Sequence, residues 1–174
     1  HHSAAPCSAQ LDKMLRRVVR VDPTPFTRIC ALINELFDGK EKHQIDTANV
    51  DRDIHNLFER QRPHLYFTDD ELTYGHNAVK RMGIPSGAKW VYLIVRDEVK
   101  HPHLPYHSYR NADIATYAEA AIALAARGYY VLRMGAKVAK PLKVNHPRVI
   151  DYASAGQDDF MNIYLGAHCE FCIS

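Results

Sequence analysis

Apolar residues recur at helical spacing through the first half of the chain. Two sets follow the spacing of an amphipathic helix, namely Leu11, Met14, Leu15 and Val18 at i, i+3, i+4 and i+7, and then Phe26, Ile29, Ile33 and Leu36 at i, i+3, i+7 and i+10. A weaker helical pattern covers residues 51–60, and the pair Thr68 and Glu71 forms a capping box that opens a further helix, which Gly83 ends. We therefore expect residues 1–86 to form a helical segment.

After residue 86 the pattern changes to strands that alternate with helices. Residues 90–95 are an unbroken run of aromatic, β-branched and leucine residues, which is typical of a strand buried on both faces of a parallel sheet. Further strands are predicted at residues 129–135, 149–153 and 169–174, and helices at residues 113–128 and 158–168. This alternation predicts an α/β fold, a Rossmann-like, doubly wound parallel sheet spanning residues 87–174.

Charge and hydropathy exclude several partners. Lys and Arg number 22 against 20 Asp and Glu, so a net charge of +2 is too small to favour nucleic acid as a partner. No run of about 18 apolar residues occurs, and we expect no transmembrane segment and a cytoplasmic location. An anion site would therefore depend on a local cluster of basic groups and not on the net charge of the chain.

No metal site is predicted. Cys169 and Cys172 form a lone C-x-x-C pair whose side chains would point to opposite faces of a strand, so we expect buried core thiols. His101, His103 and His107 lie in a proline-broken loop without the helical scaffold of metal-binding histidine motifs. We therefore expect neither a metal nor another cofactor.

Basic side chains are predicted to meet at the carboxyl ends of two strands. Arg96 follows the first strand, and Arg133 ends the second, with Gly135 free to turn tightly behind it. Because the carboxyl ends of parallel strands share one edge of the sheet, the two guanidinium groups should converge there. The alternative for each arginine is an ion pair with Asp97 or Asp113.

The segment before the predicted helix at 113–128 adds anion-binding groups. His107, Ser108, Arg110 and Asn111 precede the helix start, where unpaired N–H groups and the positive end of the helix dipole favour an anion. An arginine–phosphate pair contributes roughly 1.5–3 kcal/mol per charged hydrogen bond, against less than about 1 kcal/mol for an exposed lysine. The sequence therefore predicts a phosphate site built on arginines.

Other polar residues of this half have simpler explanations. Tyr152 could stack on a flat ring, since small residues and Gly156 follow it. Asp158 or Asp159 would cap the next helix. The lysines at 137, 140 and 143 are expected to form a solvated loop.

Several of these segments together resemble a known family. "RMGIPSGAKWVYLIVRD", "HSYRNADIATY", "GYYVLRMG", "VIDYA" and "DDFMNIYLGAHCEFCIS" are similar to bacterial glycosyltransferases of the two-domain GT-B type that are associated with surface polysaccharides. The resemblance covers residues 64–174. It implies that residues 87–174 are the nucleotide-sugar-binding half, with a nucleoside-diphosphate sugar as donor, a glycan or polysaccharide hydroxyl as acceptor, and no metal requirement.

The resemblance also implies roles for individual residues. "VRD" is distantly similar to the H-x-R motif of GDP-fucose-using transferases, which gives Arg96 the task of neutralising the leaving diphosphate, although Ile94 stands in place of the motif's histidine. His107 is then a catalytic base or a phosphate donor. Arg110, Ser108, Asn111, Arg133, Gly135 and Tyr152 complete the donor site.

Compared with the family, the chain is expected to be incomplete. A Ser/Gly-rich loop and further helices follow the last strand in the family, and residues 1–86 are too few for a whole acceptor domain. The unfinished sheet edge at residues 169–174 could be covered by a second copy in a homodimer. The rival interpretation is a non-catalytic α/β domain that binds a nucleotide or a partner, and a phosphohydrolase is disfavoured because no nucleophile is evident.

Overall fold

The chain divides into two compact units in its computed structural model. The structure describes residues 8–43, 56–96, 109, 111–135, 138–156 and 158–174, and the units span residues 1–68 and 69–174. The predicted boundary at residue 86 therefore lies too late in the chain. The helix at 69–81 belongs to the second unit, because its Gly75 and Tyr74 pack on side chains of the C-terminal helix.

The first unit is helical, as predicted. Helix α1 (Ala9–Val18) begins at Ser8, whose hydroxyl accepts a hydrogen bond from the Leu11 N–H at 3.1 Å. Helix α2 (Thr24–Asn34), the 3₁₀ turn η1 (Lys40–His43) and the short α3 (Leu57–Arg60) follow. Thr24 is the first residue of α2 and not its cap, since Pro23 occupies the capping position and provides no side-chain bond.

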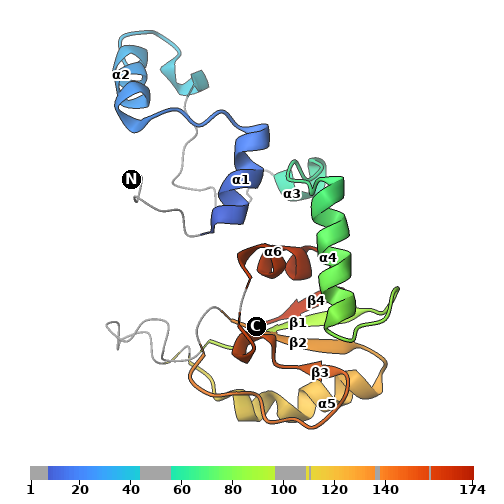
Figure 1. Ribbon diagram of the computed structural model, residues 1–174. Helices are drawn as coiled ribbons and strands as arrows, with labels where there is room; N and C mark the ends of the chain where they lie inside the picture. Colours follow the sequence, from blue (N-terminus) through green and yellow to red (C-terminus); the bar gives the residue numbers. More distant parts are fainter. Residues whose placement is uncertain (1–7, 44–55, 97–108, 110, 136–137, 157) are drawn as a thin grey trace. The chain divides into compact units, whose positions relative to one another are not determined.

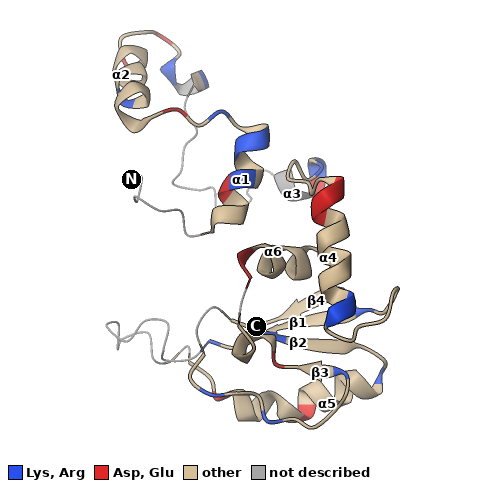
Figure 2. Ribbon diagram, viewed as in Figure 1, with Lys and Arg blue, Asp and Glu red and all other residues tan. Residues whose placement is uncertain are grey.

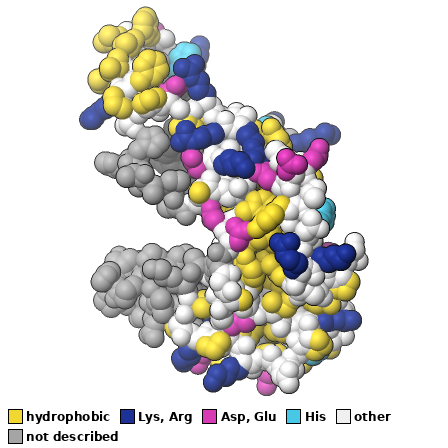
Figure 3. All heavy atoms as spheres, in the orientation of Figure 1, with side chains coloured by type: hydrophobic (Ala, Val, Ile, Leu, Met, Phe, Trp, Pro, Cys, Tyr) yellow, Lys and Arg dark blue, Asp and Glu magenta, His cyan; other side chains and the backbone are white. Residues whose placement is uncertain are grey.

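Helix α2 exposes its apolar side chains. Phe26, Ile29, Leu32, Ile33 and Leu36 are each at least half exposed, and no residue of α2 is buried. In Figure 3 these residues form the cluster of yellow spheres over α2. The prediction of a helix here is therefore confirmed, but its apolar side chains do not pack into a core among the described residues.

The second unit is built on a four-stranded, all-parallel sheet. Its strands are β1 (Trp90–Ile94), β2 (Tyr130–Met134), β3 (Val149–Ile150) and β4 (Phe171–Ile173), and their order across the sheet is β3-β2-β1-β4. Val91 pairs in register with Val131 of β2 and with Phe171 of β4. The predicted α/β fold with a parallel sheet is confirmed.

Helices cover both faces of this sheet (Figure 1). The 3₁₀ turn η5 (Ile114–Tyr117) and helix α5 (Ala118–Ala126) connect β1 to β2 on one face. Helix α6 (Asp159–Ala167) connects the turn η6 (Tyr152–Ser154) to β4 on the other face, together with α4 (Asp69–Arg81). The chain thus leaves β1 in one direction and returns to its other side, which is the doubly wound arrangement.

The two faces of β1 are not buried equally. Val91, Leu93 and Val95 are almost fully buried, and Leu93 and Val95 pack in a cluster with Ile114, Ala121, Val131 and Leu142. On the α6 face, Trp90 and Tyr92 are half-buried and Ile94 is 37% exposed. The prediction of a strand buried on both faces is therefore only partly right, because α6 covers less of β1 than α5 does.

Local signals determine where the helices begin and end. The Asp113 carboxylate accepts from the Ala115 N–H and caps η5, and the Asp158 carboxylate accepts from the Phe160 N–H and caps α6, as predicted for Asp158. Gly128 ends α5 with φ +99°, a conformation that favours glycine. Helix α4 carries acidic residues in its first turn and Lys80 and Arg81 in its last, which complements its dipole (Figure 2).

The prediction of buried cysteines is wrong. Cys30 and Cys172 are exposed, and Cys169 is half-buried. Cys172 lies in β4, which pairs only with β1 among the described strands, so its side chain has little covering structure.

Candidate functional site

A cavity of about 230 Å³ opens at the carboxyl ends of β1 and β2. Three segments enclose it: Val95 after β1, residues 111–114 before α5, and Arg133 of β2 with the connection that follows it. Its lining residues are Val95, Asn111, Ala112, Asp113, Ile114, Arg133, Ala139 and Lys140. We call this the strand-end cavity, and it lies at the edge of the sheet where parallel α/β folds bind ligands.

Arg133 is held rigidly at the base of this cavity. Its side chain is 1% exposed, and its Nη1 donates to Asp151 Oδ1 at 3.2 Å and more weakly to Oδ2 at 3.5 Å. Asp151 also accepts from the Leu142 N–H at 2.8 Å and from the Ser154 hydroxyl at 2.7 Å. The carboxylate therefore joins β2, the β2–β3 connection and η6, and it fixes the guanidinium in one orientation.

One donor of Arg133 is not satisfied by the protein. Its Nε is buried and has no hydrogen-bond partner among the described residues. A buried donor without an acceptor costs about 1–3 kcal/mol, so native structures satisfy almost all of them. An acceptor oxygen brought within hydrogen-bond distance of Nε would remove this cost.

Asp113 and Lys140 add two opposite charges at the mouth of the cavity. Lys140 Nζ lies 3.7 Å from Asp113 Oδ2, with side chains 68% and 51% exposed. Because an exposed ion pair contributes at most about 1 kcal/mol, a ligand can separate these groups at little cost. The Ala112 N–H donates to the Arg96 carbonyl at 2.9 Å, which ties the segment before η5 to the end of β1.

The structure brings together some of the predicted site residues. Asn111 and Arg133 both line the strand-end cavity. Arg96 is half-buried beside it and contacts the Ala112 backbone, but it does not line it. His107, Ser108 and Arg110 lie outside the described residues.

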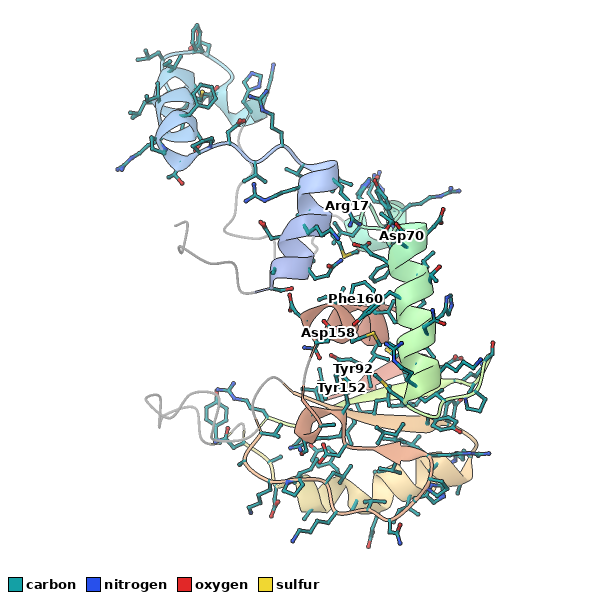
Figure 4. All side chains as sticks on the ribbon, viewed as in Figure 1. Arg17, Asp70, Tyr92, Tyr152, Asp158 and Phe160 are labelled. Carbon is teal, nitrogen blue, oxygen red and sulfur yellow. The ribbon has the colours of Figure 1, made fainter. Side chains whose placement is uncertain are left out.

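Gly135 and Tyr152 were both predicted to belong to the donor site, and the structure gives them different environments. Gly135 has φ +149°, and a Cβ there would lie 3.0 Å from Val138 Cγ1, so the backbone and the neighbouring side chain both favour glycine at this position. Tyr152 is 7% exposed, and its hydroxyl accepts from the Asp158 N–H at 3.2 Å. Tyr152, the first residue of η6, is therefore packed against the start of α6 (Figure 4). It is not among the residues that line the cavity.

Sequence reasoning missed two contributions to this site. The acidic partner of Arg133 is Asp151, whereas Asp113 lies beside Lys140 and Asp97 lies outside the described residues. Asp151 directly follows β3, the strand beside β2, and that position could have revealed it. Lys140 is 68% exposed, as expected of a solvated loop, but it also lines the cavity, whereas Lys143 is exposed and lies outside its lining. Lysine spacing within a loop carries no information about which side chain lies beside a cavity.

A second polar cluster lies at the start of α6. Tyr74 donates to Asp158 Oδ2 at 2.9 Å, which links α4 to the α6 cap, and the Tyr74 ring packs edge-on against Phe160. The hydrogen bond to Asp158 raises the pKa of Tyr74, and burial raises the pKa of Tyr152. Both hydroxyls therefore stay protonated at neutral pH, which suits a structural role better than that of a base.

Other features were sought in the described part of the chain. It holds no group of three or more His, Cys, Asp or Glu side chains arranged to bind a metal, and none of its helices is long and apolar enough to cross a membrane. The chain matches no protein-family model, no curated protein and no solved structure.

Proposed function

We propose that residues 69–174 bind a nucleoside-diphosphate sugar and form the donor-binding part of a glycosyltransferase of GT-B type. The observation that carries this proposal is the strand-end cavity, which is lined by Arg133, whose buried Nε has no acceptor among the described residues. Asn111 and Lys140 supply further donors around the same space. A phosphate offers the acceptor oxygens and negative charge that these groups require.

The size of the cavity indicates which part of the donor it would hold. Its volume of about 230 Å³ is below the roughly 300–1,000 Å³ of sites that enclose a whole drug-sized ligand. We therefore assign the diphosphate to it and leave the base and the sugar to the surrounding surface. Asp113 at the mouth would then accept hydrogen bonds from donor hydroxyls.

In the proposed reaction, an acceptor hydroxyl oxygen attacks the anomeric carbon of the sugar. The bond from that carbon to the diphosphate oxygen breaks, and the hydroxyl proton passes to a base, for which His107 is the sequence-based candidate. Negative charge develops on the leaving diphosphate, so preorganised cations stabilise the transition state more than the ground state. Arg133 fits this role because Asp151 already fixes its orientation.

Calorimetric titration of the whole chain with UDP, GDP and CDP tests the proposal. We expect one nucleotide to bind, and we expect Asn111→Ala and Lys140→Ala each to reduce its affinity by about three- to tenfold. Lys143→Ala should leave the affinity unchanged, because Lys143 does not line the cavity. Arg133→Lys keeps the charge but removes the planar fork, so we expect a loss of about tenfold or more. Binding of none of the three nucleotides by a chain with native circular dichroism would refute the proposal.

The two remaining predicted arginines are tested in the same titration. Arg96→Ala and Arg110→Ala should each reduce nucleotide affinity if these side chains also contact the diphosphate, and Arg127→Ala, an exposed arginine at the end of α5, serves as control. Unchanged affinity in both variants would remove Arg96 and Arg110 from the donor site.

The rival function is a nucleotide-binding domain without catalysis. The same cavity would serve it, and the two functions differ in turnover. Release of nucleoside diphosphate from the matching nucleotide sugar that requires the glycan acceptor, with the sugar recovered on that acceptor, would establish transfer. Tight binding without any release, whichever acceptor is supplied, would favour the non-catalytic domain.

A further inference from the structure

A second, larger hollow lies at the opposite end of the sheet. It has a volume of about 640 Å³ and is enclosed by α4, by the connection from α4 to β1 and by the end of α6. Its lining residues are His76, Asn77, Val79, Lys80, Ile84, Pro85, Ser86, Gly87, Ala88, Trp90, Tyr164 and His168. We call it the α4 groove. Trp90 opens β1 and Val95 follows it, so the groove and the strand-end cavity are separated by about 16 Å of strand.

Aromatic rings from three elements are fixed in this groove. The Trp90 indole N–H donates to the Leu165 carbonyl at 3.0 Å, which holds the ring in place. The Tyr164 ring stacks on His168 with centroids 4.2 Å apart, and His76 meets it edge-on at 6.1 Å. With the buried Ile84 and Val79 below them, these rings form an apolar surface that accommodates a flat ligand.

The charged group and the imidazoles that line the groove are basic, and the remaining titratable group is the Tyr164 phenol. Lys80 and His76 lie one turn apart on α4, and His168 faces them from the end of α6. His168 Nδ1 lies 2.9 Å from the Tyr164 carbonyl, which can only accept, so Nδ1 carries a hydrogen and the ring orientation is fixed. No described lining residue is acidic, so nothing in the lining repels an anion.

We propose that the α4 groove binds a small aromatic anion, meaning a flat unsaturated ring that carries a carboxylate or a phosphate. The ring packs against Trp90 and His168, and the anionic group is directed to Lys80. The groove volume lies within the range of small-molecule sites, and its mixture of an apolar floor with a few polar groups is typical of them. This inference does not depend on the proposed transferase function, because the two sites share no lining residue.

The chain provides its own reporter for this site. Trp90 is the only tryptophan in the sequence and it lines the groove, so its fluorescence reports ligands bound there. The probes are benzoate and phenyl phosphate, which carry the two anionic groups on the same ring. Benzamide, which has the shape of benzoate without its charge, is the matched ligand control.

We expect saturable changes in Trp90 emission with benzoate or phenyl phosphate, and binding of benzamide at least fivefold weaker. The probe that binds more tightly identifies whether carboxylate or phosphate is the preferred group. Lys80 is exposed, so Lys80→Gln should leave the fold intact. We expect this variant to reduce the affinity for the anion by about fivefold and to leave the affinity for benzamide unchanged. Lys143→Gln is the matched protein control and should change neither affinity.

Three results would overturn the inference. One is the absence of a saturable emission change with either anion in a chain that retains native circular dichroism. The second is equal affinity for benzoate and benzamide, and the third is an unchanged anion affinity in Lys80→Gln, because in both cases the groove would not select for charge. Nucleotide binding through the strand-end cavity is measured separately with Asn111→Ala, so failure of one site does not imply failure of the other.

Discussion

Asp151 connects three segments of the second unit, a role that no sequence pattern around it indicates. Its carboxylate accepts from the Arg133 guanidinium, the Leu142 N–H and the Ser154 hydroxyl, which belong to three different segments. The side chains of Arg133 and Asp151 are 1% and 16% exposed, so solvent screens this ion pair little. The geometry of the strand-end cavity therefore depends on a residue that does not line it.

Asp151→Ala should destabilise the second unit by about 3–5 kcal/mol, because it leaves the buried Arg133 without its counter-charge. The free energy of unfolding can be measured in urea from the fluorescence of Trp90, which lies in the same unit. Glu119→Ala, at an exposed position in the first turn of α5, should cost less than about 0.5 kcal/mol. Equal losses in the two variants would show that the Asp151 network is not a principal source of stability.

At the scale of elements, α4 and α6 pack against each other through a glycine and a tyrosine. An ideal Cβ on Gly75 would lie 2.2 Å from Tyr164 Cε2, well inside van der Waals contact. The Tyr164 ring cannot easily move aside, because it is 1% exposed and stacks between Phe160 and His168. A glycine is thus required in the middle of α4 despite its low helix propensity.

Gly75→Ala is expected to destabilise the second unit by about 1–3 kcal/mol, since the overpacking outweighs the gain in helix propensity of about 1 kcal/mol. Gly166→Ala in α6 is the matched control. Its new Cβ would lie 3.6 Å from the Tyr92 ring, an ordinary contact, so it should stabilise by about 0.5–1 kcal/mol. Thermal melting of both variants checks the pair, and stabilisation by Gly75→Ala would contradict the packing described for α4 and α6.

At the scale of the whole molecule, several tyrosines of the second unit share one electrostatic property. Burial raises the pKa of Tyr92, Tyr152 and Tyr164, and the hydrogen bond to Asp158 raises the pKa of Tyr74. In the folded state these hydroxyls therefore keep protons that the unfolded chain releases near pH 10. Their contribution to stability is fully present below about pH 10 and is lost as the pH rises through the folded-state pKa values.

We therefore expect the melting temperature of the second unit to fall as the pH is raised above about 10. Absorbance at the tyrosinate band, followed beside circular dichroism, should show that part of tyrosine ionisation coincides with unfolding. Tyr74→Phe removes one of the four groups and should reduce the dependence on pH. Complete ionisation of the tyrosines in a chain that remains folded would contradict this prediction.

Much of the second unit could be predicted from periodicity and terminal signals. The strands at 90–95 and 129–135 and the cap at Asp158 depend on residues close in sequence, and all were recovered. Asn111 and Arg133, two of the residues predicted at the carboxyl ends of the strands, line one cavity, whereas Arg96, which was predicted to converge with Arg133, does not line it. The roles proposed for these residues in sugar transfer remain predictions.

The sequence by itself determined the elements, their order and the edge of the sheet at which basic groups collect, because these follow from local spacing and from the geometry of parallel strands. Only the tertiary structure decided that Asp151 pairs with Arg133, that Tyr152 packs inward and that α4 joins the second unit. It alone revealed the α4 groove as well, whose residues come from positions 76–90 and 164–168. The physical reason is that burial and charge pairing depend on which side chains meet across separate elements, and the pattern along one segment does not contain that information.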